Sequence, residues 1–223
     1  MLLSKKLVIF DWDGTLLDSS GAVINAHHSA MREVDIPAIS STELERHLGK
    51  PGKTLCQTLC ENTSICANDY YSVFSKFYKE NTMHLRLFPH TQVLLQDLRS
   101  AGLKMAIATN KPKAIAMREL EATGVLSCFS ALEFADQSVA KPDPRMLSDL
   151  CKLHQVLPSQ AIMIGDQIDD SVASQRAGID CLIVYDKKLP TWHPQSGTGF
   201  MRYEDAHHTI MDRCGLLETT PTT

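Results

Sequence analysis

The sequence predicts an α/β protein, with a Rossmann-like core of three layers around a parallel β-sheet and an inserted α-helical cap. The first observation is that apolar, strand-like runs alternate with helical patterns from residue 90 onward, which is typical of a parallel sheet with right-handed crossovers. The second is that residues 20–85 contain helical patterns and no convincing strand. A helical block inserted after the first strand is the simplest explanation.

The strands are predicted from short apolar runs. Residues 7–10 form a continuous run of β-forming residues, so both faces of this strand should be covered, as in a parallel sheet. The later strand candidates are 103–108, 129–134, 161–164 and 181–185. The run at 129–134 has the weakest pattern of these.

Helices are predicted between these strands. Pro112 suits the first turn of a helix, and Gly102 and Gly178 suit helix ends. The helical patterns of the core cover 90–101, a stretch that begins at 112, 144–154 and 169–177. Residues 187–199 are rich in Pro, Gly and Lys and are expected to form a loop, and the polar end at 219–223 is expected to fray.

The inserted block carries four helical stretches, at 23–34, 42–48, 54–62 and 69–80. We therefore predict a discontinuous core domain made of residues 1–18 and 86–223, and a helical cap domain made of residues 19–85. The cap is expected above the carboxyl edge of the sheet, where the loops emerge.

Composition excludes several function classes. The formal net charge is -4, so no global basic field attracts nucleic acid or an acidic membrane. No apolar run is long enough to span a bilayer. The apolar start runs straight into Asp11 and Asp13, without the cleavage site of a signal peptide. We expect a cytoplasmic protein, monomeric or homodimeric, with no nucleic-acid or membrane partner.

The seven cysteines do not form a metal-binding pattern. No Cys-x-x-Cys pair occurs, and the cluster of Cys56, Cys60 and Cys66 lacks further ligands at zinc spacing. Reduced cysteines packed as small apolar residues are therefore predicted.

Two groups of aspartates follow predicted strands. Asp11 and Asp13 come directly after the first strand, and Asp166, Asp169 and Asp170 follow the strand at 161–164. Carboxylates that converge on one sheet edge repel unless they share a cation or a proton, and oxygen ligands suit Mg²⁺. The alternatives are a surface turn for the first pair and a helix N-cap for Asp169 or Asp170.

Two further side chains suit an anion site. Lys141 lies in a loop fixed by Pro142 and Pro144, where its ammonium can offset the acids and contact a phosphoryl oxygen. Thr109 and the backbone amides after it, at a strand-to-helix turn, make a phosphate cradle. Taken alone, Lys141 would be a solvated lysine and Thr109 a helix cap.

Four segments together resemble the four motifs of the haloacid dehalogenase superfamily. They are DWDGTLLDS at 11–19, ATNKP at 108–112, KPDP at 141–144 and GDQIDD at 165–170. The resemblance extends from Lys5 to about Tyr185, in the family's order and spacing. The nearest subgroup is the phosphoglycolate phosphatase-like branch, whose members carry a helical cap between the first and second motifs.

The resemblance implies a Mg²⁺-dependent phosphatase that works through an aspartyl-phosphate. Asp11 would be the nucleophile, and Asp13 would protonate the leaving oxygen and then take a proton from water. Asp11, the Asp13 backbone carbonyl and Asp166 would hold Mg²⁺. Asp170 matches the second acid of the last motif, while Asp169 lies one residue earlier.

Further roles follow from the same resemblance. The resemblance implies that four residues bind the phosphoryl group: Gly14, Thr109, Asn110 and Lys141. Of these, Thr109 and Lys141 also count as catalytic. An acid at Asp13 favours phosphoryl transfer, because the dehalogenases of the superfamily lack one there. Trp12 is expected to face the core, without a functional role.

The segment 47–54 resembles the substrate-specificity loop of these caps. Two glycines and a proline permit a tight turn, in which Lys50 and Lys53 could meet a carboxylate or a second phosphate of the substrate. The alternative is that both are solvated surface lysines. A small phosphorylated metabolite such as phosphoglycolate fits this pattern. His27 and His28, on the first cap helix, are expected to have packing or surface roles.

Other functions share these motifs. A phosphomutase, a pyrophosphatase or a nucleotide phosphatase would have the same core, because the cap selects the leaving group. The alternative outside the enzymes is a non-catalytic binding protein with the same fold, which would be expected to have lost Asp11, Asp13 or Lys141.

Overall fold

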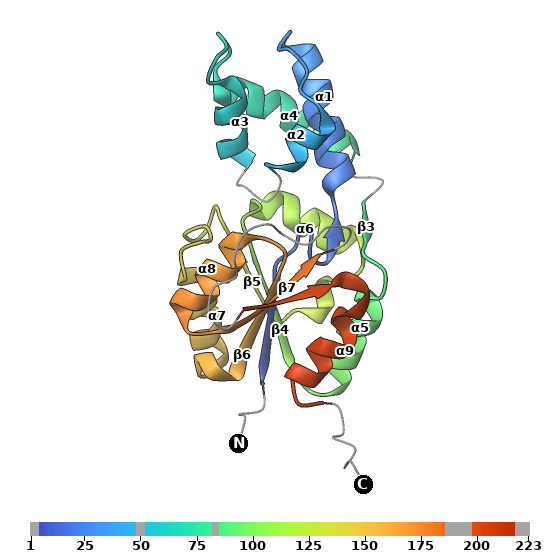
Figure 1. Cartoon of the computed structure of the whole chain (residues 1–223), viewed down its shortest axis with the longest axis vertical. Coiled ribbons are helices and arrows are strands. Elements are labelled where there is room, and N and C mark those ends of the chain that lie inside the picture. Colours follow the sequence, from blue (N-terminus) through green and yellow to red (C-terminus); the bar gives the residue numbers. More distant parts are fainter. Residues whose placement is uncertain (1–4, 48–51, 82–84, 186–197, 217–223) are drawn as a thin grey trace. The chain divides into compact units, whose positions relative to one another are not determined.

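The core of the chain is a six-stranded parallel sheet (Figure 1). The computed structural model describes residues 5–47, 52–81, 85–185 and 198–216. The strand order is β5-β4-β1-β6-β7-β8, and every adjacent pair is parallel. The strands are β1 (Leu7–Phe10), β4 (Lys104–Thr109), β5 (Ala131–Phe134), β6 (Ala161–Gly165), β7 (Asp180–Tyr185) and β8 (Thr198–Arg202).

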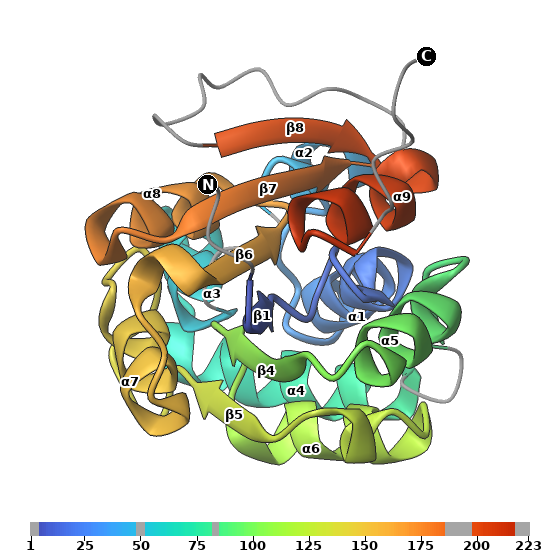
Figure 2. The same ribbon diagram turned by 90° about the horizontal axis from the view of Figure 1, so that it is seen from below.

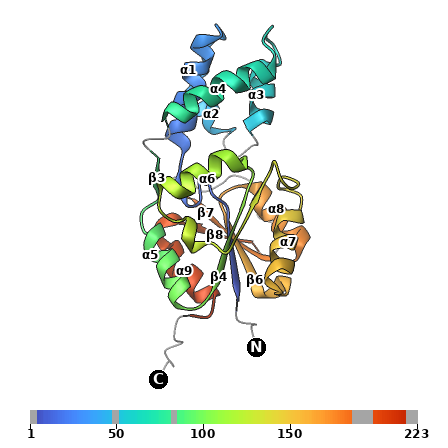
Figure 3. The same ribbon diagram turned by 180° about the vertical axis from the view of Figure 1, so that it is seen from behind.

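Helices cover both faces of this sheet, which gives three layers (Figure 2). Figure 3 shows the same sheet and helices from behind, relative to the view of Figure 1. On one face lie α7 (Arg145–His154) and α8 (Ile168–Ala177), and on the other α5 (Thr91–Ser100) and α9 (Tyr203–Arg213). The helix α6 (Lys113–Ala122) connects β4 to β5. The predicted fold class is confirmed.

The alternation of side chains along β1 builds the two sides of the core. Leu7 and Ile9 pack in one buried cluster with Met146 and Leu150 of α7. Phe10 points to the opposite side, because successive side chains of a strand alternate between the faces of the sheet. All four residues of β1 are fully buried, so the strand is apolar throughout, as the sequence predicted for a sheet covered on both faces.

The helical insert forms its own compact unit. Contacts divide the chain into Met1–Leu16 with Leu87–Thr223, and Leu17–Arg86. The helices of the second unit are α1 (Ser20–Glu33), α2 (Ser41–Glu45), α3 (Gly52–Cys60) and α4 (Ala67–Asn81). Two short strands, β2 (Leu17–Asp18) and β3 (Arg86–Leu87), pair where the chain enters and leaves this segment. The domain limits at 18/19 and 85/86 and the role of a cap stay predictions.

The end of the described chain differs from the sequence-based expectation. Thr198 and Gly199 begin β8, so the loop predicted over 187–199 is wrong at its end, and 186–197 lie outside the described residues. β8 pairs with β7 at the edge of the sheet and lacks the continuous apolar run of a central strand. The sequence did carry a signal for α9, because Ala206, Ile210 and Cys214 recur at helical spacing and are buried.

In the described part of the chain, no helix is both long and apolar enough to cross a bilayer. The seven cysteines are free thiols, and Cys56 and Cys60 are buried in α3 while Cys66 is exposed.

His27 is a core residue of the helical unit, as its predicted packing role requires. Its ring is 1% exposed and stacks on Phe74 of α4, with 4.1 Å between the ring centroids. Its Nδ1 lies 3.0 Å from the Tyr70 hydroxyl. Burial, with a smaller contribution from the neighbouring His28, lowers the pKa of His27 from 6.5 to about 4. The neutral ring is therefore the form that packs between these helices.

The lowered pKa of His27 predicts that the stability of the fold falls in acid. Because its pKa is lower in the folded state than in the unfolded chain, its contribution to stability is present above pH 6.5 and is lost as the pH falls toward 4. We expect His27→Gln to flatten the fall in the free energy of unfolding between pH 7 and pH 5, by about 2 kcal/mol at most. Urea unfolding followed by circular dichroism measures this.

The matched control is His208→Gln, which removes an exposed histidine of α9. An equal pH dependence in wild type and His27→Gln would contradict the assignment.

Candidate active site

The carboxyl ends of β1 and β6 bring three acids together. Phe10 and Ile164 are register partners, so Asp11 and Asp166 follow neighbouring strand ends. Asp170 comes from the first turn of α8. One carboxylate oxygen from each of Asp11, Asp166 and Asp170 lies within 4.8 Å of the others. The two acidic segments therefore meet closely enough to share one cation, as the sequence analysis expected for carboxylates that converge on one sheet edge.

Lys141 lies inside this acidic cluster. It is 3% exposed, and its Nζ donates to Asp11 Oδ1 at 2.8 Å, to Asp170 Oδ1 at 2.6 Å and to the Ala108 carbonyl at 2.6 Å. Burial alone would lower the pKa of Lys141, but the two carboxylates raise it above its ordinary value. Lys141 is therefore a fixed internal cation and not the solvated surface lysine of the alternative interpretation.

Asp11 and Asp166 are hard to ionise, because the pKa of each is raised in the folded chain. Burial raises the pKa of Asp11 to about 7, even though Lys141 lowers it, and the charge of Asp170 adds to the rise. Burial also raises the pKa of Asp166 well above its ordinary value, together with the charges of Asp11 and Asp170. An excess of buried negative charge of this kind is found at cation sites and catalytic sites.

Asp170 has two tasks, one for each oxygen. Oδ1 accepts from Lys141, while Oδ2 accepts the backbone N–H groups of Asp166 at 3.1 Å and Gln167 at 3.0 Å. Gln167 is the N-cap of α8, so the N-cap alternative for Asp169 or Asp170 is wrong. Asp170, the third residue of the helix, instead accepts the N-cap amide as part of a capping box and also belongs to the acid cluster. Asp169 is half-buried and lies outside the three-acid cluster. Among the described residues, Asp170 and not Asp169 is the second acid of this segment.

Two glycines let the carboxylates approach the backbone. At Gly14, where φ is +77°, a Cβ atom would overlap the carboxylate of Asp166. At Gly165 a Cβ atom would overlap the side chain of Asp170. The Thr15 hydroxyl also donates to Asp166 Oδ1 at 3.3 Å. The loop after β1 and the end of β6 are therefore packed directly on the acids.

Thr109 and Asn110 link the end of β4 to the Lys141 loop. The buried Thr109 hydroxyl accepts the Lys111 N–H at 3.1 Å. The Asn110 side chain accepts the Lys141 N–H at 2.8 Å and donates to the Lys141 carbonyl at 3.0 Å. The side chain of Asn110 thus fixes the backbone of Lys141, a role that the sequence pattern did not indicate.

Asp13 points to different partners. β1 ends at Phe10, so strand geometry does not continue to Asp13, and its side chain is not part of the three-acid cluster. Its Oδ1 accepts from Lys111 Nζ at 2.6 Å. Lys111 also donates to the buried Glu119, which accepts from Trp12 Nε1 at 2.8 Å. No pattern in the sequence predicted a role for Lys111 or Glu119. Trp12 faces the core as predicted, but it also makes a buried hydrogen bond.

The predicted specificity residues belong to the helical unit. Lys50 lies outside the described residues. Lys53, in α3, is exposed, and its Nζ lies 6.0 Å from the centroid of the Tyr71 ring. Whether either lysine meets a substrate stays a prediction.

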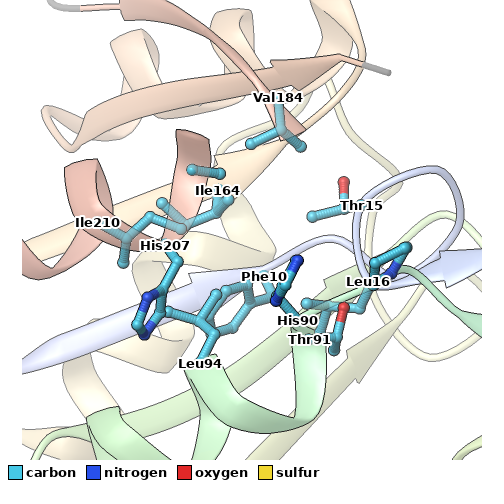
Figure 4. Close-up of a pocket in the computed structure, with 12 residues that line it drawn as sticks. Phe10, Thr15, Leu16, His90, Thr91, Leu94, Ile164, Val184, His207 and Ile210 are labelled. Atoms are coloured by element: carbon cyan, nitrogen blue, oxygen red, sulfur yellow. The ribbon is translucent and has the colours of Figure 1, made fainter. Parts of the chain in front are cut away.

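A separate apolar pocket lies between the sheet, α5 and α9 (Figure 4). It is lined by side chains such as Phe10, Leu94 and Ile210. His207 lines it as well and bonds to Asp97 at 2.9 Å. Thr15 connects the pocket wall to Asp166. None of the three clustered acids lines this pocket, so it is a packing feature of the core next to the candidate site.

A parallel sheet with acids and a lysine at its carboxyl edge defines an α/β enzyme with a carboxylate site. The model of the haloacid dehalogenase-like hydrolase family matches residues 8–184, and the chain belongs to this family.

Individual relatives agree with this assignment. The phosphoglycolate phosphatase of Vibrio cholerae is 33% identical, over 78% of this chain and 82% of its own length. A plasmid-encoded phosphoglycolate phosphatase of Cupriavidus necator is 31% identical, over 80% of each chain. The crystal structure of a predicted phosphoglycolate phosphatase from Haemophilus somnus 129PT has the same fold, with a TM-score of 0.85 at 24% identity over 94% of this chain and 100% of the other. The relatives indicate a phosphatase, a phosphoric monoester hydrolase.

Gly14, which lies against the Asp166 carboxylate, gives a test of the site's packing. Gly14 and Gly102 both have φ of +77°, but nothing lies within 4 Å of a Cβ atom built at Gly102. Alanine at either position is strained by about 1–2 kcal/mol. We expect Gly14→Ala to cost more than that in urea unfolding and to abolish phosphate release, because Asp166 must move. Gly102→Ala, the control, should keep its activity, and equal effects of the two variants would contradict the packing argument.

Proposed function

We propose that the protein hydrolyses a small phosphate monoester, with Asp11 as the nucleophile and Mg²⁺ as the cofactor. The observation that carries the proposal is the position of the Asp11 carboxylate, which lies at the end of the central strand, bonds to Lys141 and shares a cluster with Asp166 and Asp170. Such a carboxylate is held in one orientation and is surrounded by the charges that phosphoryl transfer needs.

The reaction has two steps. A carboxylate oxygen of Asp11 attacks phosphorus, the bond from phosphorus to the ester oxygen breaks, and that oxygen takes a proton from Asp13. Water then attacks the phosphorus of the aspartyl-phosphate and gives a proton back to Asp13, which releases inorganic phosphate and restores Asp11. The Asp13 side chain is 29% exposed, while Asp11 is buried, and this difference suits a group that exchanges protons with the leaving alcohol and with water.

The cluster fits a hard divalent cation. Its donors are carboxylate oxygens, and burial, together with the charges of the neighbouring acids, raises the pKa of Asp11 and of Asp166 in spite of Lys141. Asp11, Asp166 and the Asp13 backbone carbonyl would hold Mg²⁺, with Asp170 next to them. When bound, the ion would neutralise the acids and stabilise the charge on the phosphoryl oxygens.

The phosphoryl group would be bound by Gly14, Thr109, Asn110 and Lys141. The Thr109 hydroxyl accepts from the Lys111 N–H, so its own hydrogen can be donated to a phosphoryl oxygen. The backbone N–H groups at the end of β4 supply further donors. Lys141, which the carboxylates hold in place, provides positive charge next to the attacking oxygen of Asp11.

Phosphoglycolate is the substrate that we consider first. The two curated relatives reported above carry the name phosphoglycolate phosphatase. Its carboxylate would pair with Lys50 or Lys53 of the helical unit, which would act as a cap. A phosphorylated metabolite of this size also suits the proposed cytoplasmic location.

Replacement of the nucleophile is the direct test. We expect Asp11→Asn to reduce release of inorganic phosphate from phosphoglycolate by at least about a thousandfold, because an amide does not attack phosphorus. The circular dichroism spectrum should be unchanged. The control is Asp212→Asn, which changes an exposed acid of α9.

Turnover by Asp11→Asn at the rate of the wild type would rule out this nucleophile. A panel of sugar bisphosphates, pyrophosphate and nucleotides, assayed with wild-type protein and Mg²⁺, separates the other enzyme classes. A phosphomutase would convert its substrate while releasing little phosphate.

Asp166 and Asp169, which lie in one segment, give a matched pair of variants that test metal binding. We expect Asp166→Asn to weaken Mg²⁺ binding, measured by isothermal titration calorimetry, by about tenfold or more, because it removes a charged ligand. Asp169→Asn removes an acid that lies outside the cluster and should leave the affinity unchanged. Equal affinities of Asp166→Asn and wild type would exclude the proposed metal site.

A further inference from the structure

A buried carboxylate outside the four motifs connects to Asp13. Glu119 lies on α6, and its side chain is 1% exposed. Both of its oxygens accept from Lys111 Nζ, at 2.9 Å and 2.7 Å. Oε2 also accepts from Trp12 Nε1, at 2.8 Å. A buried charge needs partners of this quality, because ionised groups are costly to remove from water.

Both groups that Glu119 binds act on the same neighbour. Lys111 reaches from Glu119 to Asp13 Oδ1, at 2.6 Å, and is itself only 10% exposed. Trp12 directly precedes Asp13 in the chain and is fully buried. Glu119 therefore restrains the Asp13 side chain through the ammonium of Lys111, and it restrains the Asp13 backbone through the indole of Trp12.

This geometry gives Lys111 a fixed place between two carboxylates. Without Glu119, the ammonium would lose one of the two carboxylates that the described residues place next to it, and it could then move with Asp13 or toward a substrate oxygen. With Glu119, it is anchored on the scaffold of α6, so the carboxyl group that it contacts is anchored as well. Groups that transfer protons must be held within a few tenths of an ångström of a productive position.

We propose that Glu119 is a positioning residue for Asp13 and acts through Lys111 and Trp12. The inference rests on the proposed function, in which Asp13 transfers the proton to the leaving oxygen. A purely structural brace between α6 and the loop after β1 is the competing explanation. The positioning role and the structural brace predict different results for different substrates. Positioning of an acid matters only where the leaving group needs a proton, whereas loss of a brace would affect all substrates.

The test compares two esters with different needs for a proton. Phosphoglycolate releases an alkoxide, which must be protonated, whereas p-nitrophenyl phosphate releases a stable phenolate. The ratio kcat/KM reports only the steps up to the first phosphoryl transfer, so hydrolysis of the aspartyl-phosphate does not enter the comparison. We expect Glu119→Gln to lower kcat/KM for phosphoglycolate by about tenfold or more, and for p-nitrophenyl phosphate by about twofold or less.

Asp13→Asn and the double variant complete the experiment. Asp13→Asn should have the same substrate preference with a larger loss, and adding Glu119→Gln to it should cause no further selective loss, because both act on one step. Equal losses on both esters, or a selective loss that adds to that of Asp13→Asn, would reduce Glu119 to a structural brace. If Asp13→Asn has no substrate preference, the proposed acid is wrong, and the inference falls with it.

Two further variants guard against misfolding. Glu121→Gln changes an exposed carboxylate on the same helix and should behave as wild type with both esters. If Glu119→Gln does not fold, the double variant K111M/E119Q removes both charges together and leaves no unpaired buried ion. It should show the same selective loss, and wild-type rates in this variant would overturn the proposal.

Discussion

The ammonium of Lys141 lies among three oxygens at the carboxyl edge of the sheet, and the buried acids around it depend on its charge. It bonds to Asp11, to Asp170 and to the carbonyl of Ala108. Burying several carboxylates together costs several kcal/mol for each ion unless opposite charge and hydrogen bonds offset the loss of hydration. Since Lys141 supplies both, this contact fixes where β1, β4 and α8 meet.

The supporting contacts are mostly backbone contacts. Asn110 holds the main chain of Lys141 with two hydrogen bonds, and Asp170 holds the amides of Asp166 and Gln167. The Asn110 bonds connect two segments that lie 31 residues apart, while the Asp170 bonds are local to the start of α8. The site is therefore preorganised by the ends of strands and the start of a helix, where geometry is more rigid than in long loops.

Much of this arrangement could be predicted from the sequence, because its signals are local. The apolar run before Asp11 and the run before Asp166 identify buried strands, and parallel strands place their carboxyl ends on one edge. Glu119 could not be predicted in the same way. Its partner Trp12 is more than a hundred residues away, and a glutamate in a helix resembles any solvated surface residue until the packing is known. β8 was missed because its sequence, TGFMR, lacks the continuous apolar run that identified the other strands.

The double use of Asp170 joins local order to chemistry. One of its oxygens accepts hydrogen bonds from the backbone N–H groups of Asp166 and Gln167, and the other accepts from the Lys141 ammonium. Fraying of the opening turn of α8 would therefore swing a negative charge out of place and leave the ammonium one counter-ion short. A thermal fluctuation that is harmless at most helix ends would in this enzyme switch the electrostatic field felt by an incoming phosphate.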